Sequence, residues 1–246
     1  MRIDVLTLFP AMVETVLDTS IPGRAARGGY VSYHAHDIRS WADNPHGKVD
    51  DRPFGGGPGM VMTCQPLYDA VNAVEALDPT PARRVLLTPQ GEPLHQARVE
   101  ALAEEPRLLL IAGHYEGIDE RVIDELEPLE ISVGDFVVSG GELPALLLID
   151  AIVRLRPGVL GHEDSAAQDS FSARPAPDDK HADHAAGQRR LLDCPHYTRP
   201  RTWRSRSVPP VLISGDHAAV ARWRNKQMLE RTRARRPDLL GEVRDP

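Results

Sequence analysis

Short apolar runs alternate with longer periodic stretches over residues 1–158. Strands are predicted where the residues alternate between apolar and polar or are apolar throughout, at 3–8, 30–38, 85–87, 108–112 and 129–133. Helical periodicity predicts helices at residues 10–17, 66–77, 94–105 and 143–156. Because strands separated by helices usually pack as parallel strands joined by crossovers, we expect an α/β domain with a mainly parallel sheet.

The pattern changes after residue 161. Residues 162–190 are rich in Ala, Asp, His, Ser and Pro and contain almost no large apolar side chain, which is typical of a linker. From about residue 209 the chain becomes helical and basic, and its expected inward positions are Val220, Trp223, Met228 and Leu229. The sequence therefore predicts three parts, which are an α/β domain at 1–161, a flexible linker at 162–190 and a small helical domain at 191–246.

Composition places the chain among ordinary globular proteins. Its 246 residues are enough to bury a core, and 41% of them are apolar while 26% are charged. The two cysteines lie far apart and indicate no disulfide framework, so a reduced, cytoplasmic setting fits best. The N-terminus lacks the pattern of a signal peptide, and the longest apolar stretch, 144–153, contains Asp150 and is too short to span a bilayer. We therefore expect a cytoplasmic protein without a membrane association.

The charge is distributed unevenly along the chain. A formal net charge of −7 argues by itself against binding to nucleic acid. Residues 199–236, however, contain eleven arginines and lysines against Asp216 and Glu230, a local balance of +9. Two interpretations stay open on charge alone, because such a segment can attract a polyanion or can simply be a solvated, arginine-rich helix face.

Three glycine-containing segments are candidates for chemistry, because each lies beside the end of a predicted strand. Glycine lets the backbone approach a ligand closely, and ligands of α/β sheets bind outside the carboxyl ends of the strands. The segments are DDRPFGGGPGM at 50–60, LIAGHYEGID at 110–119 and ISVGDFVVSGGELP at 131–144.

Each segment also has a simpler structural interpretation. Arg52 in the first can bind a phosphate, but an isolated glycine-rich loop is more often a structural turn. Glu116 in the second is an acid in a tight turn, yet Asp119 and Glu120 also favour a plain helix start. The two glycine turns of the third can offer backbone groups to an adenine and a ribose.

The chain lacks the standard nucleotide-binding motifs. No predicted strand leads into G-x-G-x-x-G, which disfavours a Rossmann dehydrogenase or methyltransferase. No phosphate-binding loop exists either, because Gly47-Lys48 is followed by Val49.

Six motifs nevertheless occur in a defined order and carry a specific resemblance. They are DDRPFGGGPGMVM at 50–62, LLTPQG at 86–91, GHYEGIDERV at 113–122, GDFVVSGGELPALLLIDAIVRLRPGVLG at 134–161, DSF at 169–171 and LDCPHYTRP at 192–200. The later segment VLISGDHAAVARWRNKQMLERT is similar to the same family's helical domain. Over nearly its whole length the chain resembles the bacterial tRNA (guanine-N1)-methyltransferases, which are knotted SPOUT methyltransferases.

The resemblance implies a SPOUT-type α/β domain with a deep trefoil knot at 1–161 and a helical, tRNA-binding domain at 191–246. Members of the family transfer a methyl group from S-adenosyl-L-methionine to N1 of guanine 37, which lies 3′ of the anticodon. They bind this donor in the knot. The matching donor-binding positions here are Leu87, Thr88, Pro89, Gly113, Tyr115, Glu116, Val133, Gly134, Asp135, Phe136, Val137, Val138, Gly140, Gly141 and Pro144.

The resemblance also implies two catalytic residues. Asp169 matches the family's general base, which removes the proton from guanine N1. A free aspartate has a pKa of about 3.9 and is a weak base, so the charge that develops on guanine must be stabilised. Arg154 matches the arginine suited to that task near guanine O6. The family uses Mg²⁺ as well, and Glu116 is our candidate to lie near it, although one carboxylate does not make a metal site.

The implied partners are tRNA and a second copy of the chain. The family forms homodimers in which both subunits contribute to each active site. The target base must leave its stack, which costs a few kcal/mol. The expected tRNA contacts, which would make binding depend on salt, are Asp50, Arg52, Arg222, Arg224 and Lys226.

The chain departs from the family pattern at several places. His114 stands where the family usually has arginine, Phe136 where it often has tyrosine, and Cys194 replaces a common tyrosine. The largest departure is an insert of about 18 residues at 172–189, in the linker. Zinc-ligand spacing is loosely matched by His181, His184, Cys194 and His196, but these straddle the low-complexity segment, so we favour a His-containing linker without zinc.

Two other functions compete with methylation of guanine N1. One is an RNA-binding module that has lost catalysis, which the presence of Asp169, Arg154 and the donor-loop glycines opposes. The other is a related SPOUT enzyme that methylates a different atom, such as a ribose oxygen. The ordered occurrence of DDRPFGGGPGM and DSF speaks against that alternative.

Overall fold

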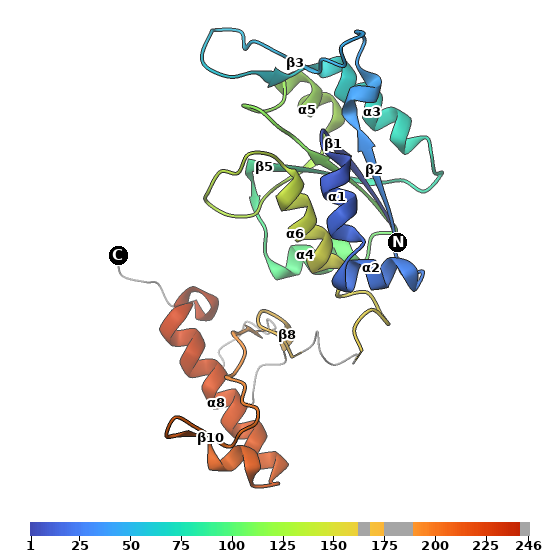
Figure 1. The fold of residues 1–246 in the computed structure, drawn as a ribbon. Coiled ribbons are helices and arrows are strands. Elements are labelled where there is room, and N and C mark those ends of the chain that lie inside the picture. Colours follow the sequence, from blue (N-terminus) through green and yellow to red (C-terminus); the bar gives the residue numbers. More distant parts are fainter. Residues whose placement is uncertain (162–167, 175–188, 242–246) are drawn as a thin grey trace. The chain divides into compact units, whose positions relative to one another are not determined.

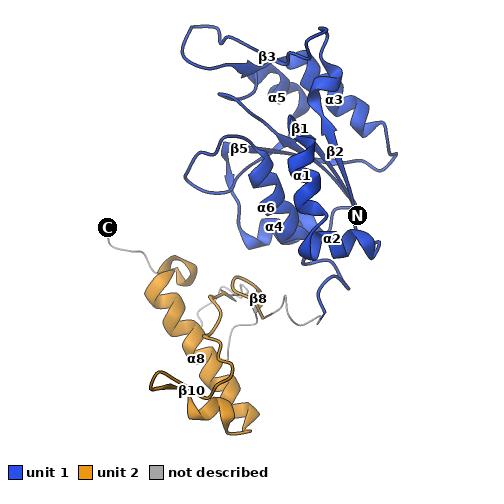
Figure 2. Ribbon diagram, in the orientation of Figure 1, with its two compact units in different colours: residues 1–161 blue, residues 162–246 orange. Residues whose placement is uncertain are grey.

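The computed structural model describes residues 1–161, 168–174 and 189–241. The chain forms two compact units, residues 1–161 and residues 162–246, which are coloured separately in Figure 2. Most of the 18-residue insert, together with His181 and His184, lies outside the described residues.

A parallel sheet forms the centre of the first unit. Within residues 1–161, all of which are described, the strand order of this five-stranded sheet is β2-β1-β6-β5-β7, and every neighbouring pair is parallel. The predicted parallel α/β domain is thus confirmed. The strands are β1 (Arg2–Thr7), β2 (Ser32–Asp37), β5 (Arg83–Pro93), β6 (Arg107–Ala112) and β7 (Leu129–Ser132).

Helices cover both faces of this sheet (Figure 1). Alternate residues of β1 serve different cores, since Ile3 and Val5 pack into one cluster and Leu6 into the other. The first cluster is completed by α1 (Pro10–Leu17), α2 (Ser20–Arg27), α4 (Gln96–Ala103) and α6 (Glu142–Val153). The second is completed by η1 (Ile38–Trp41), α3 (Cys64–Glu75) and α5 (Glu120–Leu126).

Several elements add to the sequence-based expectation. Helix α2 was not predicted, because Pro22 and Gly23 lower the helix propensity of its first turn. A Cβ at Gly23 would collide with the carbonyl of Asp18, so this helix requires glycine there. Helix α5 confirms the simpler interpretation of Asp119, whose side chain caps the helix by accepting from the Arg121 amide. Strand β5 runs beyond the predicted 85–87, with a register shift between Leu87 and Glu92.

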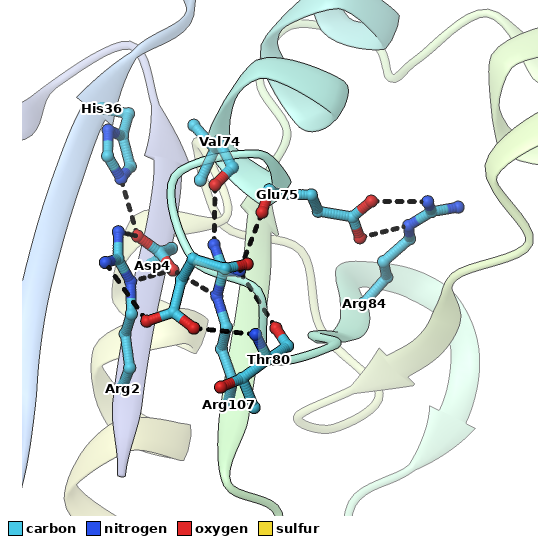
Figure 3. A network of polar contacts seen from close by, with 9 residues as sticks. Arg2, Asp4, His36, Val74, Glu75, Thr80, Arg84 and Arg107 are labelled. Carbon is cyan, nitrogen blue, oxygen red and sulfur yellow. Dashed lines mark hydrogen bonds and ion pairs between the residues drawn. The ribbon is translucent and has the colours of Figure 1, made fainter.

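A buried polar network ties the amino ends of the strands to the end of α3 (Figure 3). Arg107 opens β6 and is 1% exposed, and its Nε donates to Oδ2 of Asp4 at 3.0 Å. Arg2 and His36 also donate to the fully buried Asp4. The remaining Arg107 nitrogens donate to the carbonyls of Val74, Glu75, Asp78 and Thr80. Arg107 thereby satisfies carbonyls that the C-terminal end of a helix leaves open.

The described part of the second unit is small and largely helical. Its long helix, α8 (His217–Arg235), is capped by Asp216, and Met228 packs with Leu191 and Cys194. Of the expected inward positions Met228 is buried, while Val220, Trp223 and Leu229 are half-buried. The other elements are β8 (Ala173–Arg174), β9 (Arg189–Arg190), β10 (Thr202–Trp203), β11 (Arg206–Ser207), η2 (Pro210–Ile213) and η3 (Pro237–Leu240). None of the described helices is long and apolar enough to cross a membrane.

Candidate active site

The carboxyl ends of β5, β6 and β7 meet at one edge of the sheet and enclose a pocket of about 300 Å³. Its walls come from the irregular stretch of β5, from the loop after β6 and from the loop between β7 and α6. This is the edge at which α/β sheets bind their ligands. The three candidate chemical segments are therefore not equivalent, because the second and third form the pocket itself and the first lies beside it.

The pocket gathers most of the positions that the resemblance assigned to the donor. Among those described positions, Asp135 alone does not line it, and the Asp135 side chain is exposed. The pocket-lining residues that the prediction omitted are Leu86, Gln90, His114, Gly117, Ile118, Glu120, Ile123, Ile131, Ser132 and Ser139. All of them except Ile123 lie within the motifs 86–91 and 113–122 or the segment 131–144. Their position next to predicted donor residues in the sequence could therefore have identified them.

Glycines allow two of the pocket loops to touch backbone to backbone. The amide of Gly141 donates to the carbonyl of Gly113 at 2.7 Å, and Gly140 forms an isolated antiparallel bridge with His114. A Cβ at Gly141 would lie 2.7 Å from Cα of Ala112, which is closer than real Cβ contacts come. The junction between the two loops therefore depends on the absence of a side chain at Gly141.

The buried carboxylate of Glu142 holds one of the pocket loops in place. Glu142 begins α6 and is only 3% exposed. Its Oε1 accepts a hydrogen bond from Oγ1 of Thr7 at 2.8 Å, and its Oε2 lies 3.7 Å from Nε2 of His114. These contacts fix the start of α6, and with it the second pocket loop, against the carboxyl end of β1.

Exposed apolar side chains form one wall of the pocket. Phe136 is 59% exposed and Val137 is 82% exposed, although both are apolar. An apolar wall beside backbone polar groups is the usual composition of a site for a small organic ligand.

The glycine-rich segment at 50–60 is joined to the pocket loop that follows β6. Its flanks pair as β3 (Asp50–Asp51) and β4 (Val61–Met62), so the glycines form the tip of a hairpin. The Glu116 amide donates to the Met60 carbonyl at 3.0 Å, and a Cβ at Gly59 would collide with the Glu116 side chain. This hairpin therefore extends the rim of the pocket, with Asp50 half-buried and Arg52 exposed.

Comparison with known proteins identifies the family. The family model of tRNA (Guanine-1)-methyltransferase TrmD matches residues 1–242. The chain belongs to this family. Curated tRNA (guanine-N(1)-)-methyltransferases include one from Halorhodospira halophila, 53% identical over 97% of this chain and 84% of the relative. Another, from Rhodopirellula baltica, is 50% identical over 98% of this chain and 95% of the relative.

Neither residue expected to act on the guanine base lines the pocket. Arg154 lies away from it in the same unit, and Asp169 belongs to the second unit. Arg154 is the C-cap of α6, whereas the pocket lies at the other end of that helix, beside Gly141 and Pro144. Twelve helical residues rise about 18 Å, so a pocket and an Arg154 of the same chain are well separated. Asp169 is half-buried in the second unit, where its carbonyl accepts from the Ser172 amide.

The described residues do not form a protein-only metal site. No group of three or more His, Cys, Asp or Glu side chains able to hold a metal ion occurs in the part of this tRNA (guanine-N1)-methyltransferase family member that the structure describes. Glu116 and Glu120 are carboxylates that line the pocket, and Mg²⁺ is usually held by one or two carboxylates together with waters and substrate oxygens. Of the zinc-like set, Cys194 is buried and burial raises the pKa of its thiol, while His196 pairs with Asp193. A raised thiol pKa disfavours the thiolate that zinc needs.

Three of the basic residues expected to contact tRNA lie in the helical unit. Arg222, Arg224 and Lys226 are exposed on α8. Lys226 lies 3.7 Å from Glu230, one helical turn away, so part of its charge is offset locally. The exposure of the two arginines is compatible with both interpretations of the basic segment.

Proposed function

We propose that this chain is a tRNA methyltransferase that transfers a methyl group from S-adenosyl-L-methionine to N1 of guanine 37, 3′ of the anticodon. The observation that carries the proposal is the pocket, in which donor positions from three separate motifs converge at one sheet edge. Membership of the tRNA (guanine-N1)-methyltransferase family over residues 1–242 supports the reaction, the substrate and the deep trefoil knot.

The pocket fits an adenosine-bearing donor. Its apolar wall at Phe136 and Val137 can pack against an adenine ring, while the glycine turns leave backbone groups accessible for polar atoms. When bound, S-adenosyl-L-methionine supplies an electrophilic methyl group on a sulfonium. The residues of this chain hold the methyl group in position and keep water away from it. The hydrogen bond between Gly141 and Gly113, which fixes the two pocket loops to each other, contributes to both.

Asp169 and Arg154 divide the work at the guanine. Asp169 accepts the proton from guanine N1, which exposes the lone pair that attacks the methyl carbon. The guanidinium of Arg154 faces O6 and stabilises the negative charge that the base gains as it loses this proton. No step of this scheme is assigned to Mg²⁺, and Glu116 is the pocket carboxylate that we propose lies near it.

A second copy of the chain completes the site in this proposal. Arg154 and the pocket lie at opposite ends of α6, so Arg154 reaches a bound guanine only if it serves the pocket of another copy. Large apolar side chains are exposed on the neighbouring helices α1 and α6, which is typical of an interface. They are Met12, Val16, Leu143 and Leu147. A two-fold interface built on these helices would pair identical surfaces of the two copies.

Methylation in vitro tests the function directly. Purified protein is incubated with S-adenosyl-L-methionine, Mg²⁺ and unmodified tRNA that has guanine 3′ of its anticodon, and the modified nucleoside is mapped by mass spectrometry. We expect 1-methylguanosine at that position. A ribose-methylated product would assign the chain to a different SPOUT reaction. Binding of donor and tRNA without any methylated product would leave only a binding module.

Adding one methyl group at Gly141 should impair donor binding selectively. In Gly141→Ala the new Cβ meets Ala112 and Gly113, so the two loops must separate. Overpacking of this kind costs about 1–3 kcal/mol, equivalent to about 5- to 150-fold in affinity. Titration calorimetry with S-adenosyl-L-methionine measures the change. Gly161→Ala is the matched control, because nothing lies within 4 Å of its added Cβ, and equal affinities of the two variants would contradict the role of the junction.

A further inference from the structure

The helical unit contains a second pocket that the proposed reaction does not use. It has a volume of about 480 Å³ and is formed by the segment 194–201, by η2 and by one side of α8. Its size lies within the range of about 300–1,000 Å³ that small-ligand sites occupy. All of its residues belong to the unit that contains α8 and β10 (Figure 1).

Two aromatic rings form a face of this pocket. Tyr197 comes from the LDCPHYTRP segment and Trp223 from α8, and their ring centroids lie 6.2 Å apart at an interplanar angle of 58°. Tyr197 is 48% exposed, and Trp223 is half-buried. Exposed aromatic rings of this kind serve as platforms on which unpaired bases stack. The Tyr197 ring is thus accessible to a base, and its contact with the half-buried Trp223 ring holds it in place.

Three arginines surround the same pocket. Arg199, Arg201 and Arg224 line it and are exposed. No carboxylate of residues 189–241 lies within ion-pair distance of them, whereas Arg236 of the same unit is paired with Asp238 at 2.7 Å. Guanidinium groups without a carboxylate partner bind phosphates well, since their planar donors match phosphate oxygens.

We propose that this pocket holds one unstacked nucleotide of the tRNA, with its base against Tyr197 and Trp223 and its phosphates at the three arginines. Among the described residues, no carboxylate lines the pocket, so it lacks an aspartate like the one that takes the N1 proton in the proposed reaction, and His196, which does line it, is paired with Asp193. It is therefore a holding site, and its nucleotide differs from the methylated guanine. This inference rests on the proposed function in taking tRNA as the partner.

Binding measurements on the full chain test the two halves of the pocket. Tyr197→Leu removes the ring and keeps an apolar side chain, so tRNA should bind about 5- to 150-fold more weakly, whereas Tyr197→Phe should bind as the wild type does. Arg201→Gln should lower the slope of log K against log salt by about one phosphate contact. The charge control is Arg206→Gln, on β11 outside the pocket. Unchanged binding of Tyr197→Leu, or a loss with Arg206→Gln as large as with Arg201→Gln, would overturn the proposal.

A series of tRNAs with single abasic sites identifies the nucleotide. One abasic position should weaken wild-type binding by the same factor as Tyr197→Leu and should have no further effect on that variant, because both changes remove one stacking contact. That position should not be guanine 37. Additive losses at every position would show that no single base occupies the pocket, and thermal unfolding checks that the variants are folded.

The outcomes also separate this inference from the proposed function. With tRNA and donor saturating, the pocket variants should methylate at the wild-type single-turnover rate, because the loss lies in tRNA binding. Suppose that one abasic position and Tyr197→Leu weaken binding by the same factor and not additively, but that the wild type forms no 1-methylguanosine. The proposed function then fails and the holding site stands. If the wild type forms 1-methylguanosine but the abasic and Tyr197→Leu losses are additive at every position, the holding site alone is refuted.

Discussion

Replacing Asp169 with asparagine is expected to abolish methyl transfer while the donor and tRNA still bind. The asparagine amide has the shape of the carboxylate but cannot take a proton from guanine N1. General bases contribute about 10²- to 10⁴-fold to rates, so the single-turnover rate should fall by that factor. Single-turnover methylation with saturating donor and tRNA measures the chemical step, and equilibrium binding of both ligands is measured alongside.

A matched aspartate in the same unit controls for the loss of charge. Asp216 caps α8 by accepting from the Ala219 amide at 2.9 Å, and asparagine caps helices about as well as aspartate does. Asp216→Asn should therefore methylate at the wild-type rate. A wild-type rate in Asp169→Asn, or an equal loss in both variants, would remove Asp169 from its role as the base.

Mixing two impaired variants at limiting donor shows which chain supplies Asp169. If each site takes its pocket from one copy and Asp169 from the other, Gly141→Ala and Asp169→Asn complement each other. A mixed dimer then has one intact site, and an equal mixture should recover about a quarter of wild-type activity at limiting donor. If one chain supplied both, the mixed dimer would have no intact site and activity would not rise above that of the separate variants.

The sequence predicted elements whose physics is local. Strand β6 is apolar from Leu108 to Ala112 and buried on both faces, so its hydrophobic run alone indicated a buried strand. Helix α1 begins at Pro10, which favours a helix start, and its predicted ends are confirmed. In α2, by contrast, Gly23 is required by the close carbonyl of Asp18, a tertiary contact that no propensity contains.

The pocket was predictable only in part. Periodicity placed the three loops at strand ends, but the family motifs were needed to select their residues. Asp135 matched a motif and yet does not line the pocket, because the direction of a side chain in an irregular loop does not follow from its position in the sequence. The link between Asp4 and Arg107 escaped prediction as well, since the partners lie 103 residues apart and charged residues are rarely buried.

That buried pair supports the second prediction of a large effect, on stability. In Asp4→Ala the guanidinium of Arg107, 1% exposed, loses the only carboxylate that forms an ion pair with it among the described residues. Removing one partner of a buried ion pair costs about 3–5 kcal/mol, a large share of the 5–15 kcal/mol that stabilises a typical domain. Urea denaturation of the full chain measures the free energy of unfolding. The control is Asp18→Ala in the exposed pair with Arg27, expected to cost no more than about 1 kcal/mol.

The same pair should make stability depend on pH in the acid range. Burial alone would raise the pKa of the Asp4 carboxyl, but hydrogen bonds from His36, Arg2 and Arg107 outweigh it and hold that pKa well below its usual range. Because the folded pKa is depressed, the ionised carboxylate stabilises the fold fully above the unfolded pKa of about 3.9. Below that pH the contribution is lost progressively. The difference in unfolding free energy between the wild type and Asp4→Asn should therefore be constant near neutral pH and shrink below about pH 4. A difference that stays constant through acid pH would mean that the charge of Asp4 contributes nothing.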